Sequence, residues 1–118
     1  MATILIIDDY SDGVEALARL LRLCGHTVAT AVSGEAALNI LAAITPDFIL
    51  LDVVMPGMSG IELAQQVRKG ADAPPIIGMS GVADNDGDKF ARVFDHFLRK
   101  PIKLDELNVI LQSTAQAS

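Results

Sequence analysis

The sequence predicts an α/β fold in which a doubly wound parallel sheet carries helices on both faces. Short apolar segments rich in β-branched residues alternate with segments of helical period. This alternation is typical of a parallel sheet with crossover helices. Three of the apolar segments are nearly continuous apolar runs, as expected for strands buried on both faces. Polar residues follow the segments directly, at the strand ends where open parallel sheets gather their chemistry.

The strands and helices can be assigned in order along the chain. The five strand-like segments occupy residues 3–7, 27–31, 48–51, 76–79 and 96–98. Apolar stripes at helical spacing comprise Val14, Leu17, Ala18 and Leu21, then Ala37, Ile40, Leu41 and Ile44, and last Leu104, Leu107 and Leu111. Ser33 is a suitable N-cap for the second helix. Ser59 and Glu62 form a capping box that predicts a third helix to about Lys69.

Length and composition restrict the class of protein. The 118 residues fit a single domain, and their 51% hydrophobic content is too high for a disordered chain. We expect one domain over residues 1–118, with residues 115–118 as a frayed tail. The 15 acidic and 9 basic residues give a formal net charge of −6, which argues against direct binding of nucleic acid or an anionic membrane.

Cysteine content and hydropathy suggest a cellular compartment. The chain has one cysteine, Cys24, so it forms no intramolecular disulfide, and a reducing compartment is favoured. The position of Cys24 near the end of the first helix predicts a small buried side chain. No signal-peptide pattern opens the sequence, and no apolar run reaches the roughly 18 residues of a membrane span. These observations lead us to expect a cytoplasmic protein.

Five polar residues lie at or just after the predicted strand ends: Asp8, Asp9, Asp52, Ser80 and Lys100. Each has an ordinary structural explanation when it is taken alone, as a helix-dipole partner, an Asx turn, a cap or a solvated charge. Taken together, they place three carboxylates, a hydroxyl and an ammonium on one rim of one sheet. That combination favours a functional site.

The residue types in this group point to phosphoryl transfer. Clustered carboxylates repel one another unless a cation neutralises them, and their hard oxygen ligands suit Mg²⁺ or Mn²⁺. Lys100 suggests a second, anionic species, and Ser80 offers a hydrogen-bond donor to it. An aspartate can itself accept the phosphoryl group. Asp52 is the best candidate because it ends the central apolar strand and precedes a Gly-rich turn.

Four motifs now identify a family resemblance: residues 6–9, 51–60, 79–81 and 100–102, which read IIDD, LDVVMPGMSG, MSG and KPI. Together they resemble the receiver domain of two-component response regulators over about residues 3 to 111. The resemblance implies a flavodoxin-like fold, with five strands in the order 2-1-3-4-5 and five helices. It also implies a protein that catalyses its own aspartyl phosphorylation and dephosphorylation but is not a turnover enzyme.

The resemblance assigns roles to the metal-binding and phosphoryl-binding residues. Asp52 would accept a phosphoryl group from a phosphohistidine on a sensor histidine kinase or a histidine phosphotransfer protein. Asp9, Asp52 and the backbone carbonyl of Val54 would ligate Mg²⁺ directly, and Asp8 would act mainly through water. Lys100 would pair with the phosphoryl oxygens, or with Asp52 before transfer.

The resemblance also implies a conformational switch. Ser80 would hydrogen-bond the phosphoryl group, and Phe97 would swing inward as the Ser80 hydroxyl moves. The peptide bond between Lys100 and Pro101 would be cis, an uncommon geometry. Phe97 lacks the hydroxyl of the tyrosine found in many relatives, so no side-chain hydrogen bond can hold its outward state.

Two regions bear on the partners. The fourth helix would lie between residues 83 and 92, but residues 84–88, DNDGD, are poor helix formers. We therefore expect a short, shifted or mobile helix in the usual output surface. Leu20 and Leu23 lie on the first helix beside its core stripe. One hypothesis makes them part of a wide core face, and the other makes them a kinase-docking patch, the use that relatives make of this helix.

Two other functions remain as alternatives. A pseudo-receiver would keep the fold and bind partners without phosphorylation, but the complete Asp, Ser and Lys set argues against it. A metal-dependent phosphatase with an aspartate nucleophile would normally carry a second Asp two residues later, where this chain has Val54. The sequence names neither the kinase nor the downstream effector.

Overall fold

The structure is a computed structural model that describes residues 2–53, 60–70, 73–80 and 94–117. Its strands and helices follow one another along the chain as β1 (Thr3–Ile7), α1 (Ser11–Leu23), β2 (Thr27–Ala31), α2 (Gly34–Leu41), β3 (Phe48–Asp52), α3 (Gly60–Arg68), β4 (Ile76–Ser80), β5 (His96–Arg99) and α5 (Leu104–Ala117).

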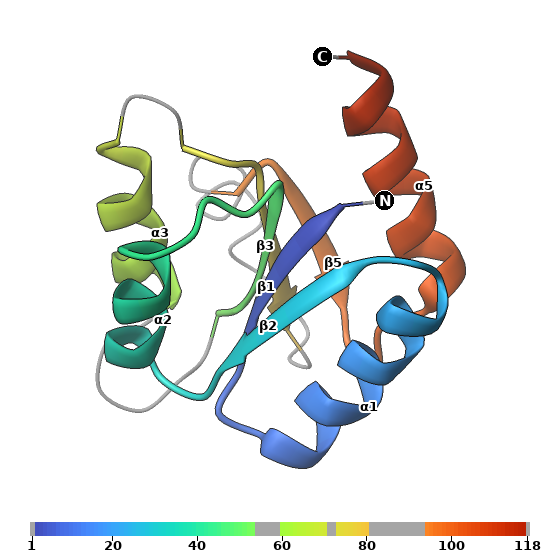
Figure 1. Cartoon of the computed structure of the whole chain (residues 1–118), viewed down its shortest axis with the longest axis horizontal. Helices are drawn as coiled ribbons and strands as arrows, with labels where there is room; N and C mark the ends of the chain where they lie inside the picture. The colour runs from blue at the N-terminus through green and yellow to red at the C-terminus, as the bar shows by residue number, and fades with distance from the viewer. Residues whose placement is uncertain (1, 54–59, 71–72, 81–93, 118) are drawn as a thin grey trace.

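The five strands form one parallel sheet in the order β2-β1-β3-β4-β5. The predicted fold class and strand order are therefore confirmed. β1 lies between β2 and β3, with Leu5 opposite both Ala29 and Ile49. Because all five strands run in the same direction, their carboxyl ends meet at one edge of the sheet (Figure 1).

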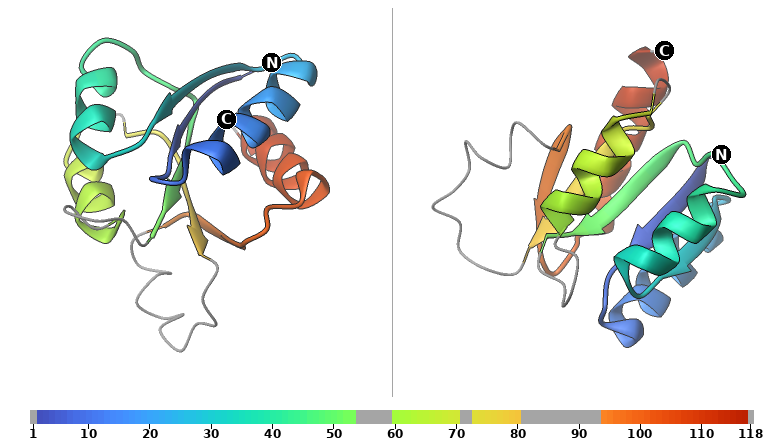
Figure 2. Two further views of the ribbon diagram at one scale, coloured as in Figure 1. Left: turned by 90° about the horizontal axis from the view of Figure 1, so that it is seen from below. Right: turned by 90° about the vertical axis from the view of Figure 1, so that its left-hand side faces the viewer.

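Helices cover both faces of the sheet. α1 and α5 pack on one face, and α2 and α3 pack on the other, as the views in Figures 1 and 2 agree. The described residues contain four helices, and the fourth of the five predicted helices falls on residues 83–92, outside them. No described helix combines the length and the apolar character needed to cross a bilayer.

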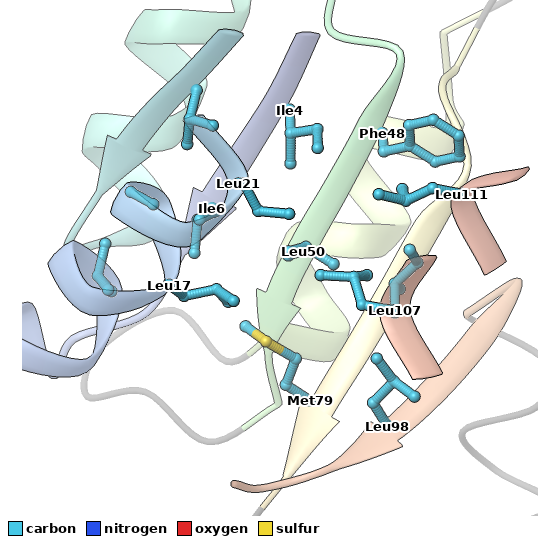
Figure 3. Close-up of a cluster of buried hydrophobic side chains, with 14 residues drawn as sticks. Ile4, Ile6, Leu17, Leu21, Phe48, Leu50, Met79, Leu98, Leu107 and Leu111 are labelled. Carbon is cyan, nitrogen blue, oxygen red and sulfur yellow. The ribbon is translucent and has the colours of Figure 1, made fainter. Parts of the chain in front are cut away.

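The core consists of two apolar clusters, one on each face of the sheet. Successive residues of β1 and β3 alternate between them, so that Ile4 and Leu50 face α1 and α5 while Leu5 and Leu51 face α2 and α3. Figure 3 shows the first cluster. Burying one such side chain contributes about 1.5–3 kcal/mol. The double burial explains why these strands read as continuous apolar runs.

The element boundaries follow local chemistry. The side chain of Ser33 accepts a hydrogen bond from the backbone N–H of Ala36 at 3.1 Å and caps α2, as predicted. α2 ends at Leu41, so the predicted helical stripe was wrong at Ile44. The proposed capping residue Ser59 lies outside the described residues.

Cys24 is exposed, and the prediction of a buried thiol was wrong. α1 ends at Leu23, and Cys24 has φ −81° and ψ 1°, outside the helical range. The helical spacing that would carry position 24 onto the buried face with Leu21 therefore no longer applies there.

Candidate functional site

Polar residues gather at the carboxyl edge of the sheet. Asp8 follows β1, Asp52 and Ser80 are the last residues of β3 and β4, and Lys100 follows β5. The strand ladder fixes these positions, since the backbone N–H of Lys100 donates to the carbonyl of Ser80 at 2.8 Å. The structure therefore brings together the strand-end residues that the sequence singled out.

Asp8 is held from three directions and is only 6% exposed. Its backbone N–H donates to the carbonyl of Ala31 at 3.0 Å, which extends the pairing of β1 with β2. Its Oδ1 accepts a hydrogen bond from the backbone N–H of Tyr10 at 3.0 Å, and its Oδ2 accepts one from Lys100 Nζ at 2.6 Å. The carboxylate is thus fixed before any ligand arrives.

Lys100 bridges two carboxylates. Its Nζ lies 2.6 Å from Asp8 Oδ2 and 3.3 Å from Asp52 Oδ2. The resemblance paired Lys100 with Asp52, and the structure adds Asp8 as the nearer partner. Burial alone would lower the pKa of Lys100, but the hydrogen bond to Asp8 and the charge of Asp52 outweigh it and raise that pKa.

The pKa of Asp8 reflects the same competition. Burial by itself would raise it, because desolvation disfavours the charged carboxylate. The hydrogen bonds from Lys100 and from the backbone of Tyr10 act in the opposite direction and hold the pKa of Asp8 below its usual value. Asp8 is therefore a carboxylate at neutral pH.

Three carboxylates form a candidate metal centre. One oxygen each of Asp8, Asp9 and Asp52 lie within 4.8 Å of one another, with Asp9 exposed and the other two buried. Carboxylate oxygens this close together are the hard donors that Mg²⁺ and similar divalent cations take in proteins. The ammonium of Lys100 offsets one of the three negative charges. The donor set therefore fits a hard divalent cation.

The backbone at Asp52 is packed tightly by the start of α3. The N–H of Gly60 donates to the carbonyl of Val53 at 3.1 Å. A Cβ at position 60 would overlap the carbonyl oxygen of Asp52 and would lie 2.7 Å from the Cα of Val53. The absence of a side chain at Gly60 thus lets α3 seat directly against the end of β3.

The remaining expected site residues have these positions. Ser80 is buried. Phe97 is half-buried against the core on the α2 and α3 side, with its ring centroid 6.5 Å from that of Phe94. The Lys100–Pro101 peptide bond is cis, the geometry that the resemblance implied. Val54, the expected carbonyl ligand, lies outside the described residues.

A cavity of about 480 Å³ opens beside Asp8 and Lys100. Its walls are mostly apolar and come from β1, α1, β4 and the segment after β5, including Leu17, Met79 and Pro101. Tyr10, which was not among the predicted site residues, also lines it. An aromatic residue directly after an Asp-Asp pair at a strand end was the available signal.

The two leucines of the proposed docking patch are exposed. Leu20 is 45% exposed and lines the same cavity, and Leu23 is 79% exposed. The hypothesis of a wide core face therefore does not hold for Leu23.

Comparisons with known proteins agree with this geometry. The family model for the response regulator receiver domain matches residues 4–112. The chain is 36% identical over 107 residues to the response regulator MprA of Mycolicibacterium vanbaalenii, an alignment that covers 88% of this chain and 46% of that protein. The chain thus spans less than half the length of this curated relative.

Solved structures show the same likeness. A CheY-like receiver domain from Methylobacillus flagellatus has a TM-score of 0.88 and 30% identity, with 96% of this chain and 98% of that chain covered. The response regulator TrrA of Thermotoga maritima, solved in complex with Mg(2+)-BeF, has a TM-score of 0.86, 31% identity and the same coverage. The chain belongs to the response regulator receiver domain family of two-component signalling.

Proposed function

We propose that Asp52 accepts a phosphoryl group from a phosphohistidine in a Mg²⁺-dependent reaction. The burial of Asp52 and the charged groups around it support this proposal. Asp52 is a carboxylate only 6% exposed at a strand end, 3.3 Å from an ammonium and grouped with two further carboxylates. Such a group combines a nucleophile with the charges that phosphoryl transfer requires.

In the proposed reaction a carboxylate oxygen of Asp52 attacks the phosphorus in line. The O–P bond forms as the P–N bond of the phosphohistidine breaks. The donor ring leaves as neutral imidazole and keeps the proton on its other nitrogen. Lys100 offsets the charge on the transferring oxygens, and the Ser80 hydroxyl donates a hydrogen bond to one of them.

Asp9 and Asp52 are the proposed direct metal ligands, and Asp8 completes the carboxylate group. When bound, Mg²⁺ would supply Lewis-acid neutralisation of the phosphoryl oxygens. The relative TrrA, whose structure is a complex with Mg(2+)-BeF, supports this choice of ion. Asp8 and Lys100 hold each other in place at 2.6 Å, and this pairing keeps the ammonium close to Asp52.

The phosphorylated form would act as a switch. A phosphoryl group carries about −2 charge at neutral pH, and it would draw Ser80 and Lys100 toward Asp52. Phe97 packs against the core and contacts Phe94, so its movement would alter the surface around β5. A partner protein or an output domain would bind that surface in one of its two conformations. The protein would control this effector without turning over a substrate of its own.

Asp52→Asn tests the proposal. We expect wild-type protein to incorporate one phosphoryl group from acetyl phosphate with Mg²⁺, and from a phosphorylated histidine kinase, while Asp52→Asn incorporates none. Asp105→Asn, which removes an exposed carboxylate of α5, should label like wild type. Stoichiometric labelling of Asp52→Asn would overturn the assignment. An unlabelled wild-type protein would favour the pseudo-receiver alternative.

A further inference from the structure

The cavity beside the candidate site has one aromatic wall. Tyr10 lines it together with Asp8 and Lys100, and the tyrosine is 63% exposed. The remaining walls are mostly aliphatic, from residues such as Val14 and Ile102. A molecule that approaches Asp8 and Lys100 through this cavity would meet the Tyr10 ring.

The ring of Tyr10 rests against the first turn of α1 because position 13 has no side chain. A Cβ at Gly13 would lie 2.8 Å from Cδ2 and 3.2 Å from Cε2 of the Tyr10 ring, too close for the ring to stay where it is. Glycine inside a helix costs about 0.5–1 kcal/mol relative to alanine. The glycine that makes room for the ring therefore lowers the stability of the helix.

The backbone of Tyr10 is anchored to the same site. Its N–H donates to Asp8 Oδ1 at 3.0 Å, and its carbonyl accepts from the N–H of Val14 at 3.1 Å. The ring is thus attached to a fixed backbone, one residue from Asp9. The ring lines the same cavity as Lys100, whose Nζ lies 3.3 Å from Asp52 Oδ2.

We propose that Tyr10 is a specificity-determining residue that favours phosphoryl donors with an aromatic ring on the leaving nitrogen. The inference rests on the proposed phosphorylation of Asp52. Aromatic rings attract one another in stacked and edge-to-face geometries, and a protonated imidazole is also attracted to a tyrosine face. The P–N bond to the ring breaks as the O–P bond to Asp52 forms, and the ring, which carries a proton on its other nitrogen, leaves as neutral imidazole beside Tyr10.

Three small donors test this selectivity without a protein partner. Phosphoimidazole has the ring, phosphoramidate has a P–N bond without a ring, and acetyl phosphate has neither. We expect Tyr10→Ala to slow labelling by phosphoimidazole about three- to tenfold, and to change labelling by the other two donors less than about twofold. Tyr10→Phe should retain the wild-type preference, because it keeps the ring.

Gly13→Ala provides an independent variant with an intact tyrosine. The added Cβ displaces the ring, while alanine favours the helix. We expect the preference for phosphoimidazole to fall without any loss of thermal stability. Two results would overturn the inference while leaving Asp52 as acceptor. One is an equal fall in the labelling rate with all three donors. The other is an unchanged ratio of the phosphoimidazole rate to the other two rates in both Tyr10→Ala and Gly13→Ala. Absence of labelling from every donor in wild type would overturn both proposals.

Fluorescence gives a second readout that needs no reaction. Tyr10 is the only tyrosine in a chain without tryptophan, so phenol emission reports on this ring alone. In unreactive Asp52→Asn with Mg²⁺, we expect phosphoimidazole to quench the emission saturably and phosphoramidate to quench it much less. Identical, purely collisional quenching by both compounds would contradict contact with the donor ring.

Discussion

Lys100 Nζ lies closer to Asp8, at 2.6 Å, than to Asp52, at 3.3 Å. The ammonium is therefore anchored by the carboxylate after the first strand while it reaches the carboxylate that ends the third. This arrangement gives the lysine a defined position between the two carboxylates. A divalent cation bound at this group would therefore compete with the ammonium for the same carboxylates.

Removal of the ammonium should tighten Mg²⁺ binding. In Lys100→Met, a competing positive charge is absent from beside Asp8 and Asp52, and we expect about three- to tenfold higher Mg²⁺ affinity. Labelling by acetyl phosphate should fall at the same time, because the charge that offsets the phosphoryl oxygens is lost. Amide chemical shifts followed during a Mg²⁺ titration measure the affinity.

Lys103→Met serves as the control for this change, since Lys103 is an exposed cation three residues away. Its Mg²⁺ affinity should match that of wild type. Weaker Mg²⁺ binding by Lys100→Met than by this control would contradict the competition.

Asp8→Asn should destabilise the protein in a pH-dependent way. At pH 7 the variant loses a charge-assisted hydrogen bond from Lys100, and we expect the free energy of unfolding to fall by about 1–3 kcal/mol. The folded pKa of Asp8 is depressed, so its contribution is present above the unfolded value of about 3.9. It is lost as the pH falls through the folded pKa.

Urea unfolding of wild type and Asp8→Asn between pH 2 and pH 7 measures this contribution. The two stabilities should converge toward the acid end of the range. A constant difference at every pH would show that the ionised form of Asp8 makes no special contribution to stability.

Gly60→Ala should weaken the packing of α3 against β3. The new Cβ would overlap the carbonyl oxygen of Asp52, and overpacking of this kind costs about 1–3 kcal/mol. Gly70→Ala is the matched control just beyond the other end of α3, where a Cβ would meet, among the described residues, only the carbonyl of Val67, at 3.5 Å. Thermal unfolding of both variants should show a loss for Gly60→Ala alone, and equal effects would rule out the close approach as its cause.

Leu20→Asp should impair transfer from a protein donor specifically. Leu20 is exposed on α1 and lines the cavity beside Asp8 and Lys100, so a docked donor would cover it. We expect transfer from a phosphorylated histidine phosphotransfer domain to slow about tenfold, with acetyl phosphate labelling unchanged. Val109→Asp, at an exposed residue of α5, is the control. Equal loss with both donors would indicate misfolding instead.

The sequence was sufficient to predict the fold because both faces of the sheet are buried. The runs around Ile6 and Leu50 are apolar at every position, and a strand covered by helices on both faces hides them from water. Three strands extend one residue beyond the predicted segments. Asp52 and Ser80 are polar and so seemed to follow the strands, but backbone pairing continues through both.

The site was predictable as a set of residues, but its contacts were not. The rule that parallel strands end at one edge places Asp8, Asp52 and Lys100 together. Lys100 lies nearer to Asp8 than to Asp52 by less than an ångström. The spacing of residues in the sequence cannot predict so small a difference in distance. The contact between Tyr10 and Gly13 depends on where one ring lies, and the same four residues, 10–13, would allow other ring positions.

The ion pair between Asp8 and Lys100 joins residues 92 positions apart, from opposite ends of the folding domain. During synthesis the carboxylates of the first three strands leave the ribosome before their lysine does. The cluster acquires its cationic partner only when the fifth strand is made and docked. A fragment that ends before Lys100 therefore has all three carboxylates but lacks the ammonium that lies within 3.3 Å of two of them.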